Sequence, residues 1–207
     1  MARLLCNHKM KRIFDFIFSV VLLISLSGLL VLISFIIFFT LGPPILFRQQ
    51  RPGHDGKPFT IFKFRTMTNK TNENEQLLDD AERITRVGYF MRRFSFDELP
   101  QLLNILKGDI SFVGPRPLLM EYLKLYTAQQ NRRHEVKPGV TGWAQVNGRN
   151  LLSWEERFEM DVWYVENQSF WLDLKILALT IRHVISGKGI SYNGNVSMRK
   201  FEGTKIE

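Results

Sequence analysis

Two adjacent carboxylates, Asp97 and Glu98, are the residues of this chain whose types and spacing best suit chemistry. They follow Ser95 and precede an apolar segment with helical spacing. One interpretation is structural, because Ser95 and Glu98 have the spacing of a capping box and acidic side chains stabilise a helix N-terminus. The other is catalytic, because an ionised carboxylate can attack phosphorus or bind a magnesium ion. Spacing alone leaves both interpretations open.

Basic residues flank this carboxylate pair and favour an anionic ligand. Arg92 and Arg93 precede it, and Arg116 follows between two prolines, where a stiff turn would preorganise the guanidinium for phosphate oxygens. The remaining basic residues nearby are Arg83, Arg86 and Lys107.

A glycine-rich stretch, residues 137–150, is a third candidate for anion binding. Its glycines could let backbone N–H groups approach a phosphate, and Arg149 could add charge, although a purely structural set of turns has the same composition. Neither the Walker nor the dinucleotide-binding spacing is present.

Composition limits the classes of partner and cofactor. With 207 residues and 45% hydrophobic residues the chain can build a sizeable core. A formal net charge of +8 favours an anionic partner, whether nucleic acid, lipid headgroup or phosphorylated substrate. One cysteine excludes an internal disulfide, and four histidines without metal-ligand spacing argue against zinc.

The segment from Phe16 to Phe47 contains no charged residue and no histidine, and it exceeds the roughly 20 residues that cross a bilayer as a helix. Lys and Arg flank it on both sides, so a single crossing would satisfy the positive-inside rule for only one flank. A helix that bends and leaves by the same face would satisfy both, and Ser25, Ser27 and Gly28 suit such a break. An ordinary single-crossing anchor is the alternative.

The other elements must position the candidate residues. Residues 45–67 predict two short strands joined by a turn, with Arg51-Pro-Gly53 and Asp55-Gly56 as the turn residues, and residues 68–80 predict a loop. Helical spacing is found over four segments, residues 82–94, 99–106, 118–130 and 154–164.

A last helix is predicted from Trp171 to Ile185, with Trp171, Leu174, Ala178, Ile181 and Ile185 on one face. Core packing of this stripe is the interpretation favoured here. A basic amphipathic helix can instead lie at a bilayer surface.

Five motifs, in this order along the chain, resemble the bacterial sugar transferase family, the monotopic polyprenyl-phosphate phosphoglycosyl transferases. The resemblance extends from the apolar segment to about Gly187, nearly the whole chain. The motifs are Lys63-Phe-Arg-Thr-Met67, Asp97-Glu-Leu-Pro-Gln101, Gly114-Pro-Arg-Pro117, Lys137-Pro-Gly-Val-Thr-Gly142 and Val146-Asn-Gly-Arg-Asn150.

The resemblance implies a mostly helical α+β fold with two parts. Residues 1–47 would form a re-entrant membrane helix, with the family's Ser-Pro bend falling on Ser27-Gly28. Residues 48–207 would form a compact cytosolic catalytic domain with a short β-hairpin and interfacial amphipathic helices. The expected location is the bacterial inner membrane, with the catalytic domain facing the cytoplasm.

The resemblance also implies roles for single residues. Asp97 would be the nucleophile and the Mg²⁺ ligand, with Glu98 supporting it, and Asp161 is a weaker supporting candidate. The implied substrate-binding residues are Lys63, Arg65, Arg92, Arg116, Arg149 and Asp173.

The implied reaction moves a sugar 1-phosphate from a UDP-sugar to polyprenyl (undecaprenyl) phosphate through an aspartyl intermediate, and it releases UMP. We expect an N-acetylated amino sugar such as diacetylbacillosamine rather than glucose or galactose. Expected partners are membrane lipids, downstream glycosyltransferases and a second copy in a homodimer. A membrane-tethered protein that binds these ligands without chemistry is the competing class. Nucleic-acid binding is not expected, because no motif for it is present.

Overall fold

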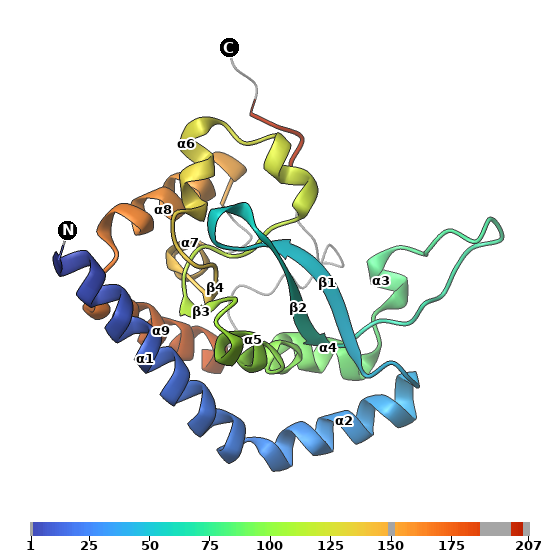
Figure 1. The fold of residues 1–207 in the computed structure, drawn as a ribbon. Coiled ribbons are helices and arrows are strands. Elements are labelled where there is room, and N and C mark those ends of the chain that lie inside the picture. The colour runs from blue at the N-terminus through green and yellow to red at the C-terminus, as the bar shows by residue number, and fades with distance from the viewer. Residues whose placement is uncertain (1, 149–151, 187–199, 205–207) are drawn as a thin grey trace.

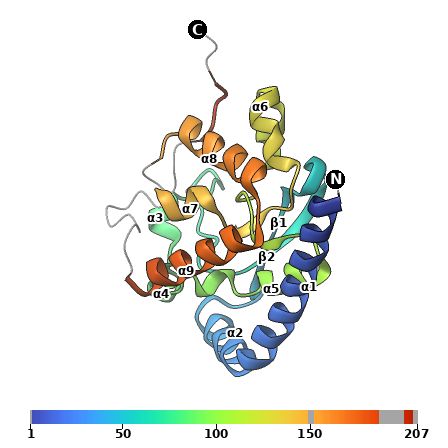
Figure 2. The same cartoon turned by 90° about the vertical axis from the view of Figure 1, so that its left-hand side faces the viewer.

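A bent pair of helices forms one edge of the computed structural model (Figure 1). The structure describes residues 2–148, 152–186 and 200–204. Helix α1 (Ala2–Ser25) and helix α2 (Ser27–Leu41) form the bent pair, and the rest of the chain packs on its concave side (Figure 2). In the described residues no single helix is long and apolar enough to span a membrane, whereas this pair passes the same test when taken together.

The predicted break in the apolar segment is confirmed and lies at Leu26, next to the expected Ser27-Gly28. The two helices meet there at 63°. Around the break Ser25 Oγ donates to the Leu22 carbonyl at 3.3 Å and Ser27 Oγ to the Ile24 carbonyl at 2.8 Å. Serine hydroxyls that bond carbonyls of the preceding turn commonly bend helices. These bonds favour a bend at this place, although Ser34 and Thr40 make similar bonds inside α2 without breaking it.

Replacing Gly28 by alanine tests whether the bend between α1 and α2 needs a glycine. A Cβ at Gly28 would meet no atom within 4 Å, and the residue lies inside α2. The variant should keep wild-type membrane association and gain about 0.5–1 kcal/mol of helix stability. Thermal unfolding and membrane fractionation would check this. Loss of membrane association in Gly28→Ala, with Ser34→Ala as a control within α2, would show that the bend depends on glycine.

The N-terminal half of α1 is docked on the rest of the chain by polar contacts. Arg12 donates to the carbonyls of Ile105 at 2.6 Å and Leu106 at 2.8 Å, and the buried Asp15 accepts from the Phe112 N–H at 3.3 Å. A guanidinium at the C-terminal end of helix α5 (Gln101–Lys107) satisfies free carbonyls there. Because these groups are paired, α1 has a fixed orientation relative to the domain that it joins.

The predicted hairpin is confirmed. Strand β1 (Leu46–Pro52) pairs antiparallel with strand β2 (Pro58–Phe64), with Leu46 opposite Phe64. The turn is a short 3₁₀ helix (His54–Gly56) in which Asp55 and Gly56 both have positive φ. Aspartate and glycine tolerate this conformation best, so the Asp-Gly pair determines where the chain reverses.

A second sheet joins strand β3 (Ser111–Val113) to strand β4 (Gly139–Thr141) in parallel. Two glycines make this pairing possible, because a Cβ at Gly139 would lie 2.1 Å from the Gly114 nitrogen. The glycines of the 137–150 stretch thus serve close backbone packing here. The main core surrounds this sheet and includes Ile105, Ile110 and Ile176.

Two predicted helices are each broken in the structure. The expected helix over 82–94 is divided into α3 (Asp80–Arg83) and α4 (Arg86–Arg93), because Thr85 accepts from the Gly88 N–H at 2.9 Å and starts a new helix. The expected helix over 118–130 is a 3₁₀ helix (Met120–Lys124) followed by α6 (Ala128–Asn131). The predicted loop over 68–80 projects from the body of the fold (Figure 1).

Helices α5, α8 (Trp154–Asn167) and α9 (Phe170–Ser186) agree with the three remaining helix predictions, over residues 99–106, 154–164 and 171–185. The expected core packing of the α9 stripe is wrong, since Trp171 is 78% exposed and Ile185 77%. The opposite face is buried instead, because Ile176 packs in the core and Asp173 pairs with Lys11 of α1. Periodicity located an apolar stripe but could not say which face the core would cover.

Candidate active site

Asp97 and Glu98 lie on a 3₁₀ helix (Phe96–Glu98) between α4 and α5. Ser95 precedes it with φ of 57°, a left-handed conformation that reverses the chain after α4. The Ser95 side chain makes no capping hydrogen bond, and the Glu98 carboxylate points to other partners. The capping-box interpretation is therefore wrong, and the pair is free to form a site.

Glu98 binds two cations with one carboxylate oxygen. Lys63 Nζ and Arg116 Nη2 each lie 2.6 Å from Glu98 Oε1, which joins β2 and the Gly-Pro-Arg-Pro turn to the 3₁₀ helix. Burial alone would raise the pKa of Glu98, but Arg116 and Lys63 together overcome this and hold it well below its ordinary value. Glu98 is therefore ionised throughout the neutral range and orients both cations.

Asp97 has no such partner. It is 8% exposed, and no described residue donates a hydrogen bond to its carboxylate. Burial and the adjacent Glu98 charge raise its pKa to about 6, against the lowering influence of Lys63, Arg92 and Arg116. The Asp97 carboxylate is therefore mostly ionised at neutral pH, and its oxygens accept no hydrogen bond from a described residue.

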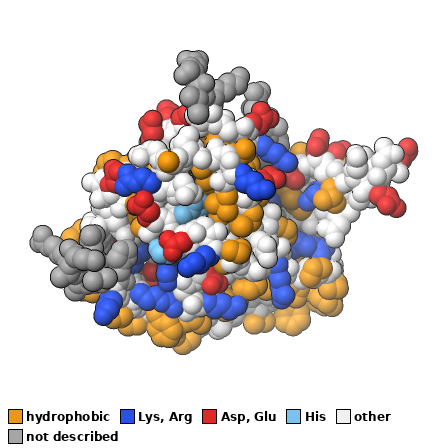
Figure 3. Space-filling view, turned by 45° about the horizontal axis from the view of Figure 1, so that its top comes forward, with side chains coloured by type: hydrophobic (Ala, Val, Ile, Leu, Met, Phe, Trp, Pro, Cys, Tyr) orange, Lys and Arg blue, Asp and Glu red, His pale blue; other side chains and the backbone are white. Residues whose placement is uncertain are grey.

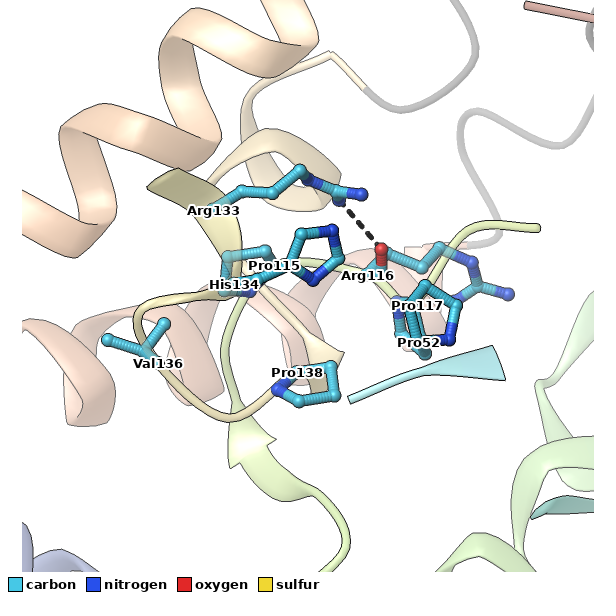
Figure 4. Close-up of a pocket in the computed structure, with 8 residues that line it drawn as sticks. All are labelled: Pro52, Pro115, Arg116, Pro117, Arg133, His134, Val136 and Pro138. Atoms are coloured by element: carbon cyan, nitrogen blue, oxygen red, sulfur yellow. Dashed lines mark hydrogen bonds between the residues drawn. The ribbon is translucent and has the colours of Figure 1, made fainter. Parts of the chain in front are cut away.

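A buried ion pair supports the turn that carries Arg116. Arg133 Nη2 donates to the Arg116 carbonyl at 2.7 Å, the bond drawn in Figure 4, and also lies 2.6 Å from Asp161 Oδ2. The side chains of Arg133 and Asp161 are 1% and 2% exposed. Asp161 thus neutralises the arginine that holds the Arg116 backbone in place, a supporting role that agrees with its weaker candidacy.

The candidate site is a cavity of about 960 Å³, a size typical of small-molecule sites. Its lining includes Lys63, Asp97, Glu98, Arg116 and Asp161. One part of its wall is strongly basic, and another is apolar and includes residues next to the bend of the helix pair. The basic residues are Arg51, Lys63, Arg65, Arg83, Arg92, Arg116 and Arg157; the apolar ones include Leu22, Leu26, Phe112 and Val140.

Three of the basic residues predicted to bind substrate use their side chains differently. Lys63 pairs with Glu98, and Arg92 Nε donates to Thr66 Oγ1 at 3.0 Å. Arg65 donates to the carbonyl oxygens of Leu41 and Pro44, at the C-terminal end of α2. All three line the cavity, but Arg65 also fastens the helix pair to the hairpin.

Asp173, also predicted to bind substrate, is not brought to this cavity. Its carboxylate pairs with Lys11 Nζ and accepts from the Tyr164 hydroxyl at 2.6 Å, inside the contact between α1 and α9. Its position indicates a structural role in orienting α1. Arg149 lies outside the described residues.

The cavity also contains residues that the sequence prediction did not select. Asp80, Arg83, Gln145 on α7 (Trp143–Asn147) and Arg157 all line it. Arg83 belonged to the basic set near the carboxylates, and Gln145 lies in the glycine-rich stretch, but residue type and spacing did not distinguish either from its neighbours.

A basic cavity around a buried carboxylate pair, adjoining a bent apolar helix pair, is the kind of site that suits enzymes acting on anionic, phosphorylated ligands. The chain belongs to the bacterial sugar transferase family, whose model matches residues 6–187. The resemblance drawn from the five motifs is therefore confirmed.

Three relatives illustrate the family. The chain is 54% identical over 195 residues to the uncharacterized sugar transferase EpsL of Bacillus subtilis (strain 168), covering 94% of this chain and 96% of that protein. It is 40% identical over 187 residues to the UDP-glucose:undecaprenyl-phosphate glucose-1-phosphate transferase of Escherichia coli (strain K12), covering 84% of this chain but 40% of that one. It is also 40% identical over 197 residues to the undecaprenyl-phosphate galactose phosphotransferase of Salmonella typhimurium, covering 87% and 41%. The chain thus spans about two fifths of the length of the latter two.

Proposed function

We propose that this protein transfers a sugar 1-phosphate from a UDP-sugar to undecaprenyl (polyprenyl) phosphate and releases UMP. The observation that carries the proposal is the buried Asp97, to which no described residue donates a hydrogen bond, beside the Lys63–Glu98–Arg116 ion pairs in a basic cavity that reaches the bend of the helix pair. The names of the Escherichia coli and Salmonella relatives support the same reaction.

The two kinds of wall suit the two substrates. The nucleotide sugar is soluble and carries two phosphates, which the basic wall would neutralise. The lipid acceptor is a phosphate on a long apolar chain, so its first isoprene units would lie against Leu22, Leu26 and Phe112. Both phosphates would then meet at Asp97.

The reaction would proceed in two displacements. A carboxylate oxygen of Asp97 attacks the sugar-bearing phosphorus, the bond between this phosphorus and the UMP oxygen breaks, and UMP leaves with that electron pair. A phosphate oxygen of the lipid then attacks the same phosphorus and releases the Asp97 carboxylate. Arg116 and Lys63, oriented by Glu98, would stabilise the charge on the phosphoryl oxygens.

The residues present fit a magnesium ion held together with substrate phosphates. The described residues contain no group of three or more His, Cys, Asp or Glu side chains that could hold a metal by themselves. Mg²⁺ commonly binds one or two carboxylates and completes its coordination with phosphates and water. Asp97 supplies one free carboxylate, and bound Mg²⁺ would contribute Lewis-acid stabilisation of phosphoryl charge.

The surface supports an interfacial location. Hydrophobic side chains gather along one edge of the molecule with Lys and Arg beside them (Figure 3). The exposed stripe of α9 and the exposed apolar residues of α2, such as Phe39, are of the type that enters a lipid interface. We propose that the bent pair is re-entrant, with both basic flanks on the cytoplasmic side of the inner membrane.

The sugar is the least constrained part of the proposal. The names of the Escherichia coli and Salmonella relatives specify glucose and galactose, whereas we expect an N-acetylated amino sugar. We therefore propose a UDP-hexose or a UDP-N-acetylated amino sugar as donor and leave the choice between them to assay.

UMP release from a panel of UDP-sugars tests the proposed function directly. Membranes containing the full chain, with undecaprenyl phosphate and Mg²⁺, should release UMP with at least one of UDP-glucose, UDP-galactose and UDP-diacetylbacillosamine. The rate should rise with pH through about 6, because Asp97 must be ionised to attack. Binding of lipid or UDP-sugar without any UMP release would support the competing class of a binding protein.

A further inference from the structure

Gln145 presents an amide group whose hydrogen-bonding capacity is unused. Both Nε2 and Oε1 are shielded from solvent and find no partner among the residues that the structure describes, and the side chain lines the cavity that contains Asp97. An amide has two donors and an acceptor, and leaving them unsatisfied in a buried position is unfavourable. A buried amide of this kind is expected where a bound ligand supplies the missing hydrogen bonds.

The polar groups beside Gln145 are already satisfied. Thr141 Oγ1 lies 2.7 Å from Thr180 Oγ1, and Thr180 donates to the Ile176 carbonyl at 2.8 Å. Ala144 and Val184 complete this part of the wall. The residues that β4, α7 and α9 contribute to the cavity are uncharged, whereas α8, which packs on α7, contributes Arg157 and Asp161 and the hairpin contributes Lys63 to the charged part of the wall.

The backbone around Gln145 is held by close packing. A Cβ at Gly142 would lie 2.7 Å from Gln145 Oε1 and 2.2 Å from the Gly114 carbonyl oxygen, so only glycine leaves room for the side chain here. A ring nitrogen of His183 lies 3.2 Å from the Val146 carbonyl oxygen and ties α9 to α7. The helix that carries Gln145 is thus held in place, while its amide makes no hydrogen bond to any residue that the structure describes.

We propose that Gln145 recognises the uracil base of the nucleotide donor, an inference that rests on the proposed function. Uracil is planar and uncharged, and its imide edge presents an N3–H donor next to a carbonyl acceptor. A carboxamide matches this edge with one acceptor and one donor. The diphosphate belongs with the cations around Glu98, and a sugar ring with several hydroxyls would leave most of them unpaired at this wall.

Gln145→Leu removes both hydrogen bonds and keeps the approximate volume of the side chain. The variant should weaken inhibition by UMP and raise KM for the UDP-sugar by the same factor, about 10- to 100-fold. Its kcat should stay within about threefold and KM for undecaprenyl phosphate should not change. Without nucleotide its melting temperature should be unchanged or higher, because the buried amide has no partner in the free protein. Gln129→Leu, on the exposed surface of α6, is the matched control.

Three results would overturn the assignment. A raised KM for the UDP-sugar with unchanged inhibition by UMP would place Gln145 against the sugar. If neither KM for the UDP-sugar nor inhibition by UMP changed, Gln145 would not contact the nucleotide donor. A lower melting temperature together with loss of binding would make its role structural. UMP-induced thermal stabilisation, present in wild type and lost in Gln145→Leu, would support the base contact even if no UDP-sugar were turned over, so the two proposals can fail separately.

Discussion

Replacing Asp97 by asparagine is expected to abolish turnover while making the folded chain more stable at neutral pH. Asparagine cannot attack phosphorus, so the rate of UMP release should fall by about 10⁴-fold or more. The stabilisation follows from the buried position of Asp97, which is 8% exposed and has no hydrogen-bonding partner among the described residues. Holding the charged form there is unfavourable, and the amide removes the charge.

The pH dependence of this gain has a definite sign. The pKa of Asp97 is about 6 in the folded chain and near 3.8 when unfolded, so the folded state binds the proton more tightly. Wild-type stability from this group is fully present below pH 3.8 and is lost as pH rises through about 6. The advantage of Asp97→Asn should therefore be absent at pH 3.5 and reach on the order of 2–3 kcal/mol at pH 7.5.

Denaturant unfolding at both pH values, beside a UMP-release assay, would measure the two effects together. Asp79→Asn, an exposed position in the loop before α3, is the matched control and should change neither. Near-full activity of Asp97→Asn would refute the assignment of Asp97 as the nucleophile. Equal stability of wild type and variant at pH 7.5 would show that the buried charge of Asp97 does not destabilise the folded chain.

Replacing Glu98 by glutamine should have the opposite effect on stability. Its carboxylate holds Lys63 Nζ and Arg116 Nη2 at 2.6 Å each, and the amide would remove the counter-charge that both cations contact directly, leaving only the charge of neighbouring Asp97. We expect a loss of about 2–3 kcal/mol at pH 7, less than for a fully buried pair because the Arg116 side chain is 39% exposed. The pKa of Glu98 is depressed in the folded chain, so this loss should be full at neutral pH and shrink as pH falls below 4.5.

Glu98→Gln should also change the pH profile of the reaction. The Glu98 charge is one of the causes that raise the pKa of Asp97, so its removal should move the acid limb of kcat/KM to lower pH, even as the maximal rate falls. The double variant Lys63→Met with Glu98→Gln removes one unpaired cation and should recover part of the lost stability. If the acid limb of kcat/KM stayed near pH 6, the group that controls it would not be influenced by the Glu98 charge, and the assignment of Asp97 to this limb would be contradicted.

The sequence alone was enough to select most of the candidate site, because that selection depends on residue types at close spacing. Asp97, Glu98 and Arg116 were identified by their neighbours along the chain, and the Asp55-Gly56 turn predicted the hairpin. The bend near Ser27 followed from small residues and hydroxyls in an otherwise apolar segment. Each of these is a local property, decided within one or two turns of backbone.

Predictions that depended on distant partners failed or stayed open. The spacing of Ser95 and Glu98 fits a capping box, but Lys63 and Arg116 offer Glu98 a stronger charged interaction than a backbone N–H would. Asp173 was expected to contact substrate, yet Lys11 of α1 engages it in the contact between two helices. Gln145 could not be distinguished from other glutamines, because its lack of partners appears only when every neighbour is in place.

The sequence by itself therefore determined the class of reaction chemistry, the apolar helix pair and the family. Tertiary structure decided that Glu98 is paired with Lys63 and Arg116, while no described residue hydrogen-bonds Asp97. It also decided which face of α9 is covered by the core. The physical reason is that charge and hydrophobicity are carried by single residues, whereas burial, pKa and hydrogen-bond satisfaction belong to pairs of residues that folding brings together.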